Sequence, residues 1–292
     1  MSKIKIITDT AADIMPDVAA ANNIEVMSIP ITIDGEGYRE GIDFSKTEFY
    51  ERLKNAAAIP VTSQVTAIEY MDAYKKCFDE GYDEVIVVTI NSKGSGMYNS
   101  ALMGINNLTE EYPETEGKIK IRVVDSLNYS VMYGYAVVKA AEMVKANKSA
   151  DEIVAYLEDF FTRVQSIFTV FTLDYAKKSG RISATAAFVG EKLGLRPVMD
   201  ITDGSISVFD KARGDKNTLA RMLREIIALK DEPKSDYVMI YGEDIEPAKQ
   251  LEAMIKEHYG ISACGYCQIG ASVTINAGPK LCGVMIIGKK RR

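Results

Sequence analysis

Residues 84–111 constrain the fold more than any other part of the chain. Residues 85–90 are all β-branched, which is typical of a strand that is buried on both faces of a sheet. A turn rich in glycine and serine follows at 91–96, and 96–111 is predicted to be a helix. A buried strand that leads into a helix is half of a β-α-β unit, so we expect a mostly parallel sheet.

This alternation continues through the first 164 residues and then changes. Strands are predicted at 4–8, 24–33 (as one or two segments) and 118–124, and helices at 16–23, 45–55, 66–81, 130–147 and 149–164. Beyond residue 164, strands are predicted at 166–173, 195–201, 205–211, 237–241, 261–267 and 282–287, with helices at 215–230 and 246–259 and a helical or irregular stretch at 174–194.

The fold class that follows is α/β with two domains. The first, residues 1–164, is expected to hold a mostly parallel sheet with helices on both faces. The second, residues 165–292, contains Thr202-Asp203-Gly204 between two predicted strands, which is a hairpin signal. We therefore expect a mixed or antiparallel sheet with helices in this domain.

Composition excludes several classes of partner. The net charge of −6 and the lack of clusters of basic and aromatic residues argue against nucleic acid and anionic membranes. No apolar run reaches membrane-spanning length, and the N-terminus enters a strand without a signal-peptide core. Four unevenly spaced cysteines indicate reduced thiols. We expect a cytoplasmic protein that makes at most transient contact with a membrane.

The turn at 91–96 is a candidate anion site. The predicted helix would point backbone N–H groups and the Ser95 hydroxyl at a ligand above the strand end. The turn has neither the spacing of a P-loop nor that of a dinucleotide site, so a small anion such as a carboxylate fits better. The alternative is an ordinary turn in which Ser95 is the helix N-cap.

Hydroxyl and acidic groups also follow other predicted strands. They are found in Thr8-Asp9-Thr10 and Asp125-Ser126, and Thr62-Ser63-Gln64 precedes a predicted helix. Ligands of open parallel sheets bind outside the carboxyl ends of the strands. These groups are therefore expected near one site, although helix and turn capping would explain each of them as well.

An ordered set of motifs over the whole chain resembles the DegV family. The motifs are Thr8-Asp9-Thr10, Thr62-Ser63-Gln64, Ser92-x-Gly94-Ser95-Gly96, Asp125-Ser126, Lys178-Ser179-Gly180-Arg181-Ile182-Ser183, Arg196-Pro197 and Gly278-Pro279. The resemblance implies a two-domain α/β protein that holds one long-chain fatty acid between its domains. It also implies that some members present the carboxylate to a separate ATP-dependent fatty acid kinase subunit.

The resemblance also implies which residues bind the ligand. Thr62 and Ser95, with Gly96 beside it, match the residues that hold the carboxylate, and Arg181 and Arg213 match two family arginines. Asn276 stands where the family commonly has a histidine, and it cannot carry a proton near neutral pH. Lys93 and Met97 also depart from the family pattern. These departures put kinase coupling in more doubt than lipid binding. The apolar residues that would line an acyl tunnel, or simply form core, are Phe161, Phe168, Phe171, Phe188, Val189, Leu193 and Leu195.

The sequence thus predicts a fatty-acid-binding protein with no chemistry, cofactor or metal of its own. One alternative is a metal-dependent phosphatase or phosphotransferase centred on Asp9. Another is a binding protein for a different small organic acid. A zinc site built from Cys264, Cys267, Cys282 and His258 is disfavoured because positions three apart in a strand face opposite sides.

Overall fold

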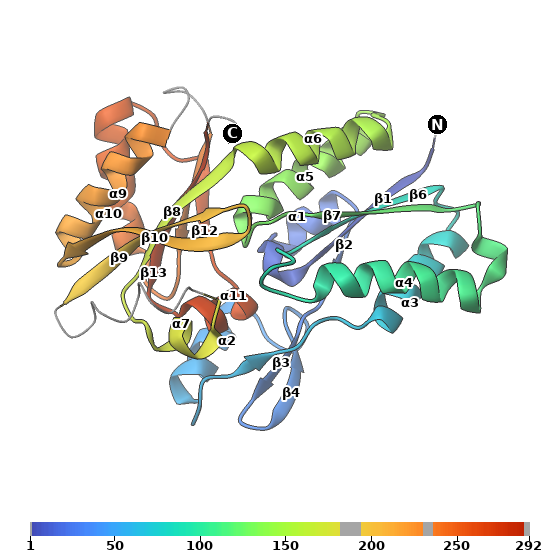
Figure 1. Ribbon diagram of the computed structural model, residues 1–292, viewed down its shortest axis with the longest axis horizontal. Helices are drawn as coiled ribbons and strands as arrows, with labels where there is room; N and C mark the ends of the chain where they lie inside the picture. Colours follow the sequence, from blue (N-terminus) through green and yellow to red (C-terminus); the bar gives the residue numbers. More distant parts are fainter. Residues whose placement is uncertain (1, 182–193, 230–235, 289–292) are drawn as a thin grey trace. The chain divides into compact units, whose positions relative to one another are not determined.

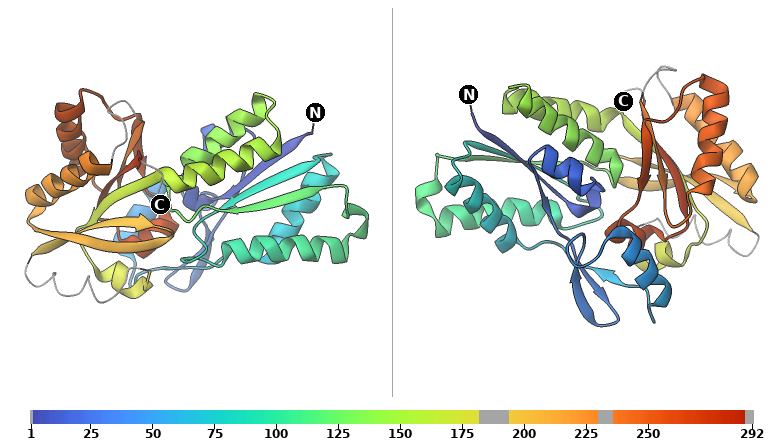
Figure 2. Two further views of the ribbon diagram at one scale, coloured as in Figure 1. Left: turned by 45° about the horizontal axis from the view of Figure 1, so that its top comes forward. Right: turned by 180° about the vertical axis from the view of Figure 1, so that it is seen from behind.

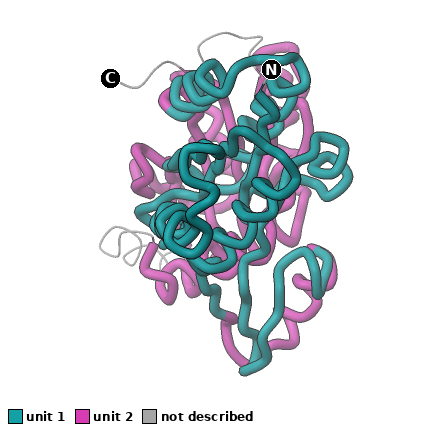
Figure 3. The backbone as a smooth tube through the Cα atoms, turned by 90° about the vertical axis from the view of Figure 1, so that its right-hand side faces the viewer, with its two compact units in different colours: residues 1–45, 61–161 teal, residues 46–60, 162–292 magenta. Residues whose placement is uncertain are grey.

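The computed structural model describes residues 2–181, 194–229 and 236–288 (Figure 1). Within it the chain forms two compact units, and both are discontinuous in sequence. Unit 1 consists of residues 1–45 and 61–161, and unit 2 of residues 46–60 and 162–292 (Figure 3). The fold class is α/β, as the sequence predicts.

Unit 1 is built on a four-stranded parallel sheet. Its strand order is β2 (Ile24–Met27), β1 (Ile4–Asp9), β6 (Glu84–Thr89) and β7 (Lys120–Asp125). The two central strands are buried almost throughout, which explains why they are rich in β-branched residues on both faces instead of alternating between apolar and polar ones. All four strands point the same way, so their carboxyl ends meet at one edge.

Helices cover both faces of this sheet. They are α1 (Pro16–Ala21), α3 (Ala67–Asp79), α4 (Met97–Glu111), α5 (Val131–Lys145) and α6 (Ala150–Arg163), with short 3-10 turns η1 (Thr10–Ala12) and η2 (Pro113–Thr115). Figure 1 shows α3 and α4 on one face of the sheet and α5 and α6 on the other. The predicted layers of this part of the chain are therefore confirmed.

A small antiparallel sheet in unit 1 was missed by the sequence reading. It contains β4 (Glu36–Arg39), β3 (Pro30–Ile33) and β5 (Val61–Thr62), in that order. Asp34 and Gly35 have positive φ and make the turn between β3 and β4, and residue 36 already begins a strand. These strands are two to four residues long, too short for a periodic signal.

Unit 2 is built on a six-stranded mixed sheet. Its strand order is β10 (Ser205–Arg213), β9 (Leu195–Thr202), β8 (Val164–Val170), β13 (Leu281–Ile287), β11 (Tyr237–Tyr241) and β12 (Gly265–Gln268). Only the β11–β12 pair is parallel. Asp203 and Gly204 have positive φ, so the predicted hairpin is confirmed with the backbone that its residues favour. The predicted strand 261–267 is shorter than expected.

Helices α9 (Asp215–Leu229) and α10 (Glu246–Tyr259) pack on one face of the mixed sheet, as seen from two sides in Figure 2. Their buried residues form a core with residues of β8, β11 and β13, which includes Ile167, Met222, Met239, Leu251 and Val284. Both helices were predicted from the sequence, and the bounds of α10 are confirmed at both ends.

Among the described residues of unit 2, three further helices are α2 (Lys46–Asn55), α7 (Asp174–Ser179) and α11 (Ala271–Ala277). Helix α11, which we did not predict, packs against both of the others. The Tyr50 hydroxyl lies 3.0 Å from the Ile269 carbonyl oxygen, to which it donates, and 2.9 Å from Thr274 Oγ1. These contacts hold α2 in unit 2 although it precedes β5 in sequence.

None of the helices in the described part of the chain is long and apolar enough to cross a membrane.

Candidate functional site

The carboxyl edge of the parallel sheet gathers the polar residues that the sequence singles out. Asp9 ends β1, the turn 90–96 follows β6, and Asp125 ends β7. Asp9 is completely buried. Its Oδ2 accepts a hydrogen bond from Ile90 N at 3.0 Å, and its Oδ1 accepts from Ala11 N at 3.1 Å and from the Tyr133 hydroxyl at 2.6 Å.

The base of the 90–96 turn is held by three consecutive backbone N–H groups, which donate to the end of β1 and to the segment 125–128 at the end of β7. Ile90 N donates to Asp9, Asn91 N to the Asn128 carbonyl at 3.1 Å, and Ser92 N to Asp125 Oδ1 at 3.1 Å. These bonds leave the base little conformational freedom, which is what a preorganised binding loop needs.

The end of this turn is the N-terminus of α4, a helix of 15 residues. The Ser95 and Gly96 backbone N–H groups donate to no other residue within the described parts of the chain. The Ser95 hydroxyl accepts a 3.4 Å hydrogen bond from Met97 N and can still donate its own proton. Two N–H groups and one hydroxyl at the positive end of a helix dipole form an arrangement that suits an anion.

The alternative that Ser95 is the helix N-cap is wrong by one residue. Gly96 occupies the N-cap position, and no side chain caps the helix there. Because Ser95 Oγ accepts from Met97 N, the backbone N–H groups that stay available to a ligand here are those of Ser95 and Gly96.

The Thr62-Ser63-Gln64 segment lies beside the N-terminus of α4. Thr62 is half-buried on β5, opposite Ile31. Gln64 Nε2 donates to Ser100 Oγ at 3.0 Å, and a Cβ added to Gly96 would lie 1.8 Å from Gln64 Oε1. Gln64 was not among the binding residues predicted from the sequence. Its side chain packs directly over Gly96, so a larger residue at position 96 would have to displace it.

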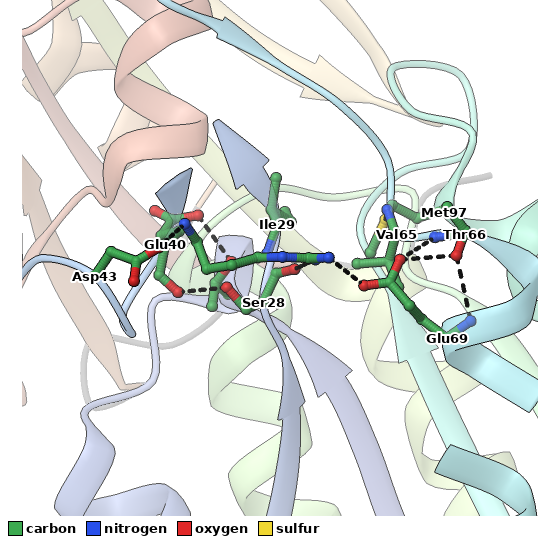
Figure 4. A network of polar contacts seen from close by, with 10 residues as sticks. Ser28, Ile29, Glu40, Asp43, Val65, Thr66, Glu69 and Met97 are labelled. Carbon is green, nitrogen blue, oxygen red and sulfur yellow. Dashed lines mark hydrogen bonds and ion pairs between the residues drawn. The ribbon is translucent and has the colours of Figure 1, made fainter. Parts of the chain in front are cut away.

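A network of polar contacts fixes the small sheet near this segment (Figure 4). The Arg39 guanidinium, on β4, pairs with Glu69 Oε1 at 2.6 Å and donates to the Ser28 carbonyl at 3.1 Å. Glu69 also completes a capping box with Thr66, the N-cap of α3. Partial burial raises the pKa of Glu69, but the hydrogen bonds from Thr66 and Arg39 outweigh it and lower the pKa below its ordinary value.

The other predicted binding residues lie in unit 2. Arg181 is exposed just after α7, and its Nη1 donates to the Ser179 carbonyl at 2.7 Å. Arg213 is exposed at the end of β10. Asn276 lies on α11, which packs against α7, and its Nδ2 donates to the Ser272 carbonyl at 2.7 Å. The structure thus places Thr62, Ser95 and Gly96 in unit 1, and the remaining three in unit 2.

The apolar residues suggested for an acyl tunnel have mixed locations. Phe168 and Phe161 are buried, while Phe171 packs against the unit 2 core from a partly buried position. Leu195 is half-buried on β9. Phe188, Val189 and Leu193 lie outside the described residues, as do Ile182 and Ser183 of the Arg181 motif.

The geometry of Asp9 opposes the phosphatase alternative. Burial raises the pKa of this carboxyl from 3.8 to about 6, against the effect of its three hydrogen bonds. A side chain with no exposed surface and both oxygens engaged cannot reach a substrate. Among the described residues, no three histidine, cysteine or acidic side chains are grouped so that they could hold a metal ion. Cys282 is buried, whereas Cys264 is exposed.

Comparison with known proteins assigns the chain to a family. Residues 3–289 match the model of the family described as "Uncharacterised protein, DegV family". A DegV domain-containing protein of Caldanaerobacter subterraneus is 31% identical, over 97% of this chain and 98% of its own length. Another, from Clostridium perfringens, is 31% identical over 99% of this chain and 98% of its own length.

Solved structures of DegV family proteins have the same fold as this chain. A DegV family protein from Thermus thermophilus, described in terms of fatty acid binding, is 25% identical with a TM-score of 0.85, covering 98% of this chain and all of that one. A fatty-acid-binding DegV family protein from Streptococcus agalactiae is also 25% identical, with a TM-score of 0.85 over 99% of this chain and all of that one. The chain described here belongs to the DegV family.

Proposed function

We propose that this protein binds one long-chain fatty acid and holds its carboxylate at the N-terminus of α4. The observation that carries the proposal is the group of unpaired donors there: the Ser95 and Gly96 N–H groups and the Ser95 hydroxyl. A carboxylate accepts hydrogen bonds but donates none, so it matches this set of donors. The relatives described as fatty-acid-binding support the same assignment.

The energetics suit a lipid acid. Each buried methylene contributes about 0.8 kcal/mol, so a long acyl chain supplies roughly 10 kcal/mol before the costs of association. An unpaired buried carboxylate would cost several kcal/mol. Charge-assisted hydrogen bonds at a helix N-terminus offset that cost without a full positive charge.

The proposed head-group residues in unit 1 are Thr62, Ser95 and Gly96. Arg181, Arg213 and Asn276 are assigned to fatty acid binding from the family resemblance, and their roles stay predictions. So do the placement of the acyl chain between two domains and the presentation of the acid to a separate kinase subunit. Asn276 supplies only an amide dipole, and one of its N–H groups is already bound to Ser272. A kinase partner would therefore have to work without the family histidine.

Mass spectrometry of the denatured protein is the first test of this function. Purified protein should release about one fatty acid per chain. Calorimetry on the delipidated protein should then show that a fatty acid binds at least about tenfold more tightly than its methyl ester, because the ester has lost its charge.

Three results would favour other readings. Equal affinity for acid and ester would mean that no carboxylate site exists. Preference for a short organic acid would support a binding protein for that acid. Hydrolysis or transfer of a phosphoryl group that needs added Mg²⁺ would revive the enzyme centred on Asp9.

A further inference from the structure

Asp9 uses its two carboxylate oxygens for different purposes. Oδ1 accepts a hydrogen bond from Ala11 N, and this bond caps η1. The same oxygen accepts from the hydroxyl of Tyr133, which lies on α5, so it also connects the start of η1 to that helix. Among the described residues, Oδ2 accepts only from Ile90 N, the first residue of the turn that leads to Ser95. Capping and packing therefore account for one oxygen, and the turn accounts for the other.

The ionised form of Asp9 destabilises the folded state. The side chain is completely buried, and burial raises its pKa well above the ordinary value. A serine would cap η1 equally well, because serine is among the preferred N-cap residues. A carboxylate differs from serine here by its second oxygen, Oδ2, and by its charge. The only contact that accounts for Oδ2 in the described part of the chain is the hydrogen bond from Ile90 N.

We propose that Asp9 is a positioning residue for the carboxylate site, acting through the backbone of Ile90. This inference rests on the proposed function. Asp9 does not touch the ligand; it fixes the residue from which the turn leaves the sheet, and thereby the direction in which the Ser95 and Gly96 N–H groups point. The two neighbouring bonds, from Asn91 N and Ser92 N, complete the anchor. An error in this direction would weaken binding of the charged head group but not of the acyl chain, because hydrogen bonds depend steeply on angle.

The test separates the two oxygens. Asp9→Ser keeps an oxygen for Ala11 but is too short to reach Ile90. The matched control is Tyr133→Phe, which removes a partner of Oδ1 and leaves the contact with Ile90 intact. Calorimetry with a saturated long-chain fatty acid and its methyl ester gives an acid-to-ester affinity ratio for each protein.

We expect Asp9→Ser to lower the ratio by about tenfold or more, with ester affinity within about twofold of the natural protein. Tyr133→Phe should keep the natural ratio. A folded Asp9→Ser protein with an unchanged ratio would overturn the inference while leaving the proposed function intact. Absence of any preference for the acid in the natural protein would instead overturn the proposed function, and the inference with it.

Amide hydrogen exchange keeps the inference testable if Asp9→Ser does not fold. In the natural protein without ligand, the Ile90 amide should exchange only through global unfolding, while the Ser95 and Gly96 amides exchange fast. Added fatty acid should slow exchange at Ser95 and Gly96 and leave Ile90 unchanged. An Ile90 amide that exchanges as fast as Ser95 in the free protein would show that the turn is not anchored there.

Discussion

At the scale of single residues, Ser95 tests the proposed site most directly. Ser95→Ala removes a hydroxyl at a helix N-terminus, and a hydrogen bond to a charged group typically contributes about 1.5–3 kcal/mol. Calorimetry should show fatty acid affinity reduced by roughly ten- to a hundredfold, with little change for the methyl ester. Thr109→Ala is the control, since it removes a hydroxyl from the other end of α4. Equal losses for acid and ester would contradict a head-group role.

Asp9 predicts an unusual pH dependence of stability. Its folded-state pKa of about 6 lies above its ordinary value of 3.8, so the folded protein binds this proton more tightly than the unfolded chain does. Stability from this group is therefore present at low pH and lost as pH rises from about 4 to about 6. Asp9→Asn does not titrate. The unfolding free energy of the natural protein, relative to this variant, should fall by about 2 kcal/mol between pH 4 and pH 7, because the unfolded chain has already lost part of this proton at pH 4. A relative stability that rises over this range would contradict the prediction.

At the scale of elements, the pair between Arg39 and Glu69 fastens the small sheet to α3. Both side chains are partly exposed, so Arg39→Ala should lower the unfolding free energy by less than about 1 kcal/mol. The local effect should be larger, because Arg39 lies on β4, which pairs directly with β3 in this sheet. Hydrogen exchange should therefore accelerate at residues 30–33 and 36–39. Lys75→Ala, which breaks an ion pair with Asp79 within α3, should leave these strands unchanged.

At the scale of the whole molecule, α2 shows that neither unit is a continuous piece of chain. Tyr50 is buried, and its hydroxyl joins α2 to Ile269 and Thr274. Tyr50→Phe leaves those partners unsatisfied and should cost about 1–2 kcal/mol, measured by denaturant unfolding. In a double-mutant cycle, Thr274→Val should add less than its own cost on this background. Full additivity would mean that the hydroxyl does not couple the two helices. The boundary after residue 164, as a statement about independent folding, stays a prediction.

Sequence by itself determined the elements whose identity comes from local chemistry. The β-branched run of β6 and the Asp203-Gly204 hairpin each carry their conformation in adjacent residues. Sequence also placed Ser95 at the N-terminal end of a helix, because the strand, the turn and the helix follow one another directly in the chain.

Only the tertiary structure decided what depends on residues far apart in the chain. It buried Asp9 against Ile90 and Tyr133, placed Gln64 across Gly96, and attached α2 to unit 2 through Tyr50. The short strands β4 and β5 and the seven-residue helix α11 likewise form because packing and pairing stabilise them, not because of periodicity. The contacts of Asp9, Gln64 and Tyr50 named above join residues at least 32 apart, so no local pattern of the sequence could reveal them.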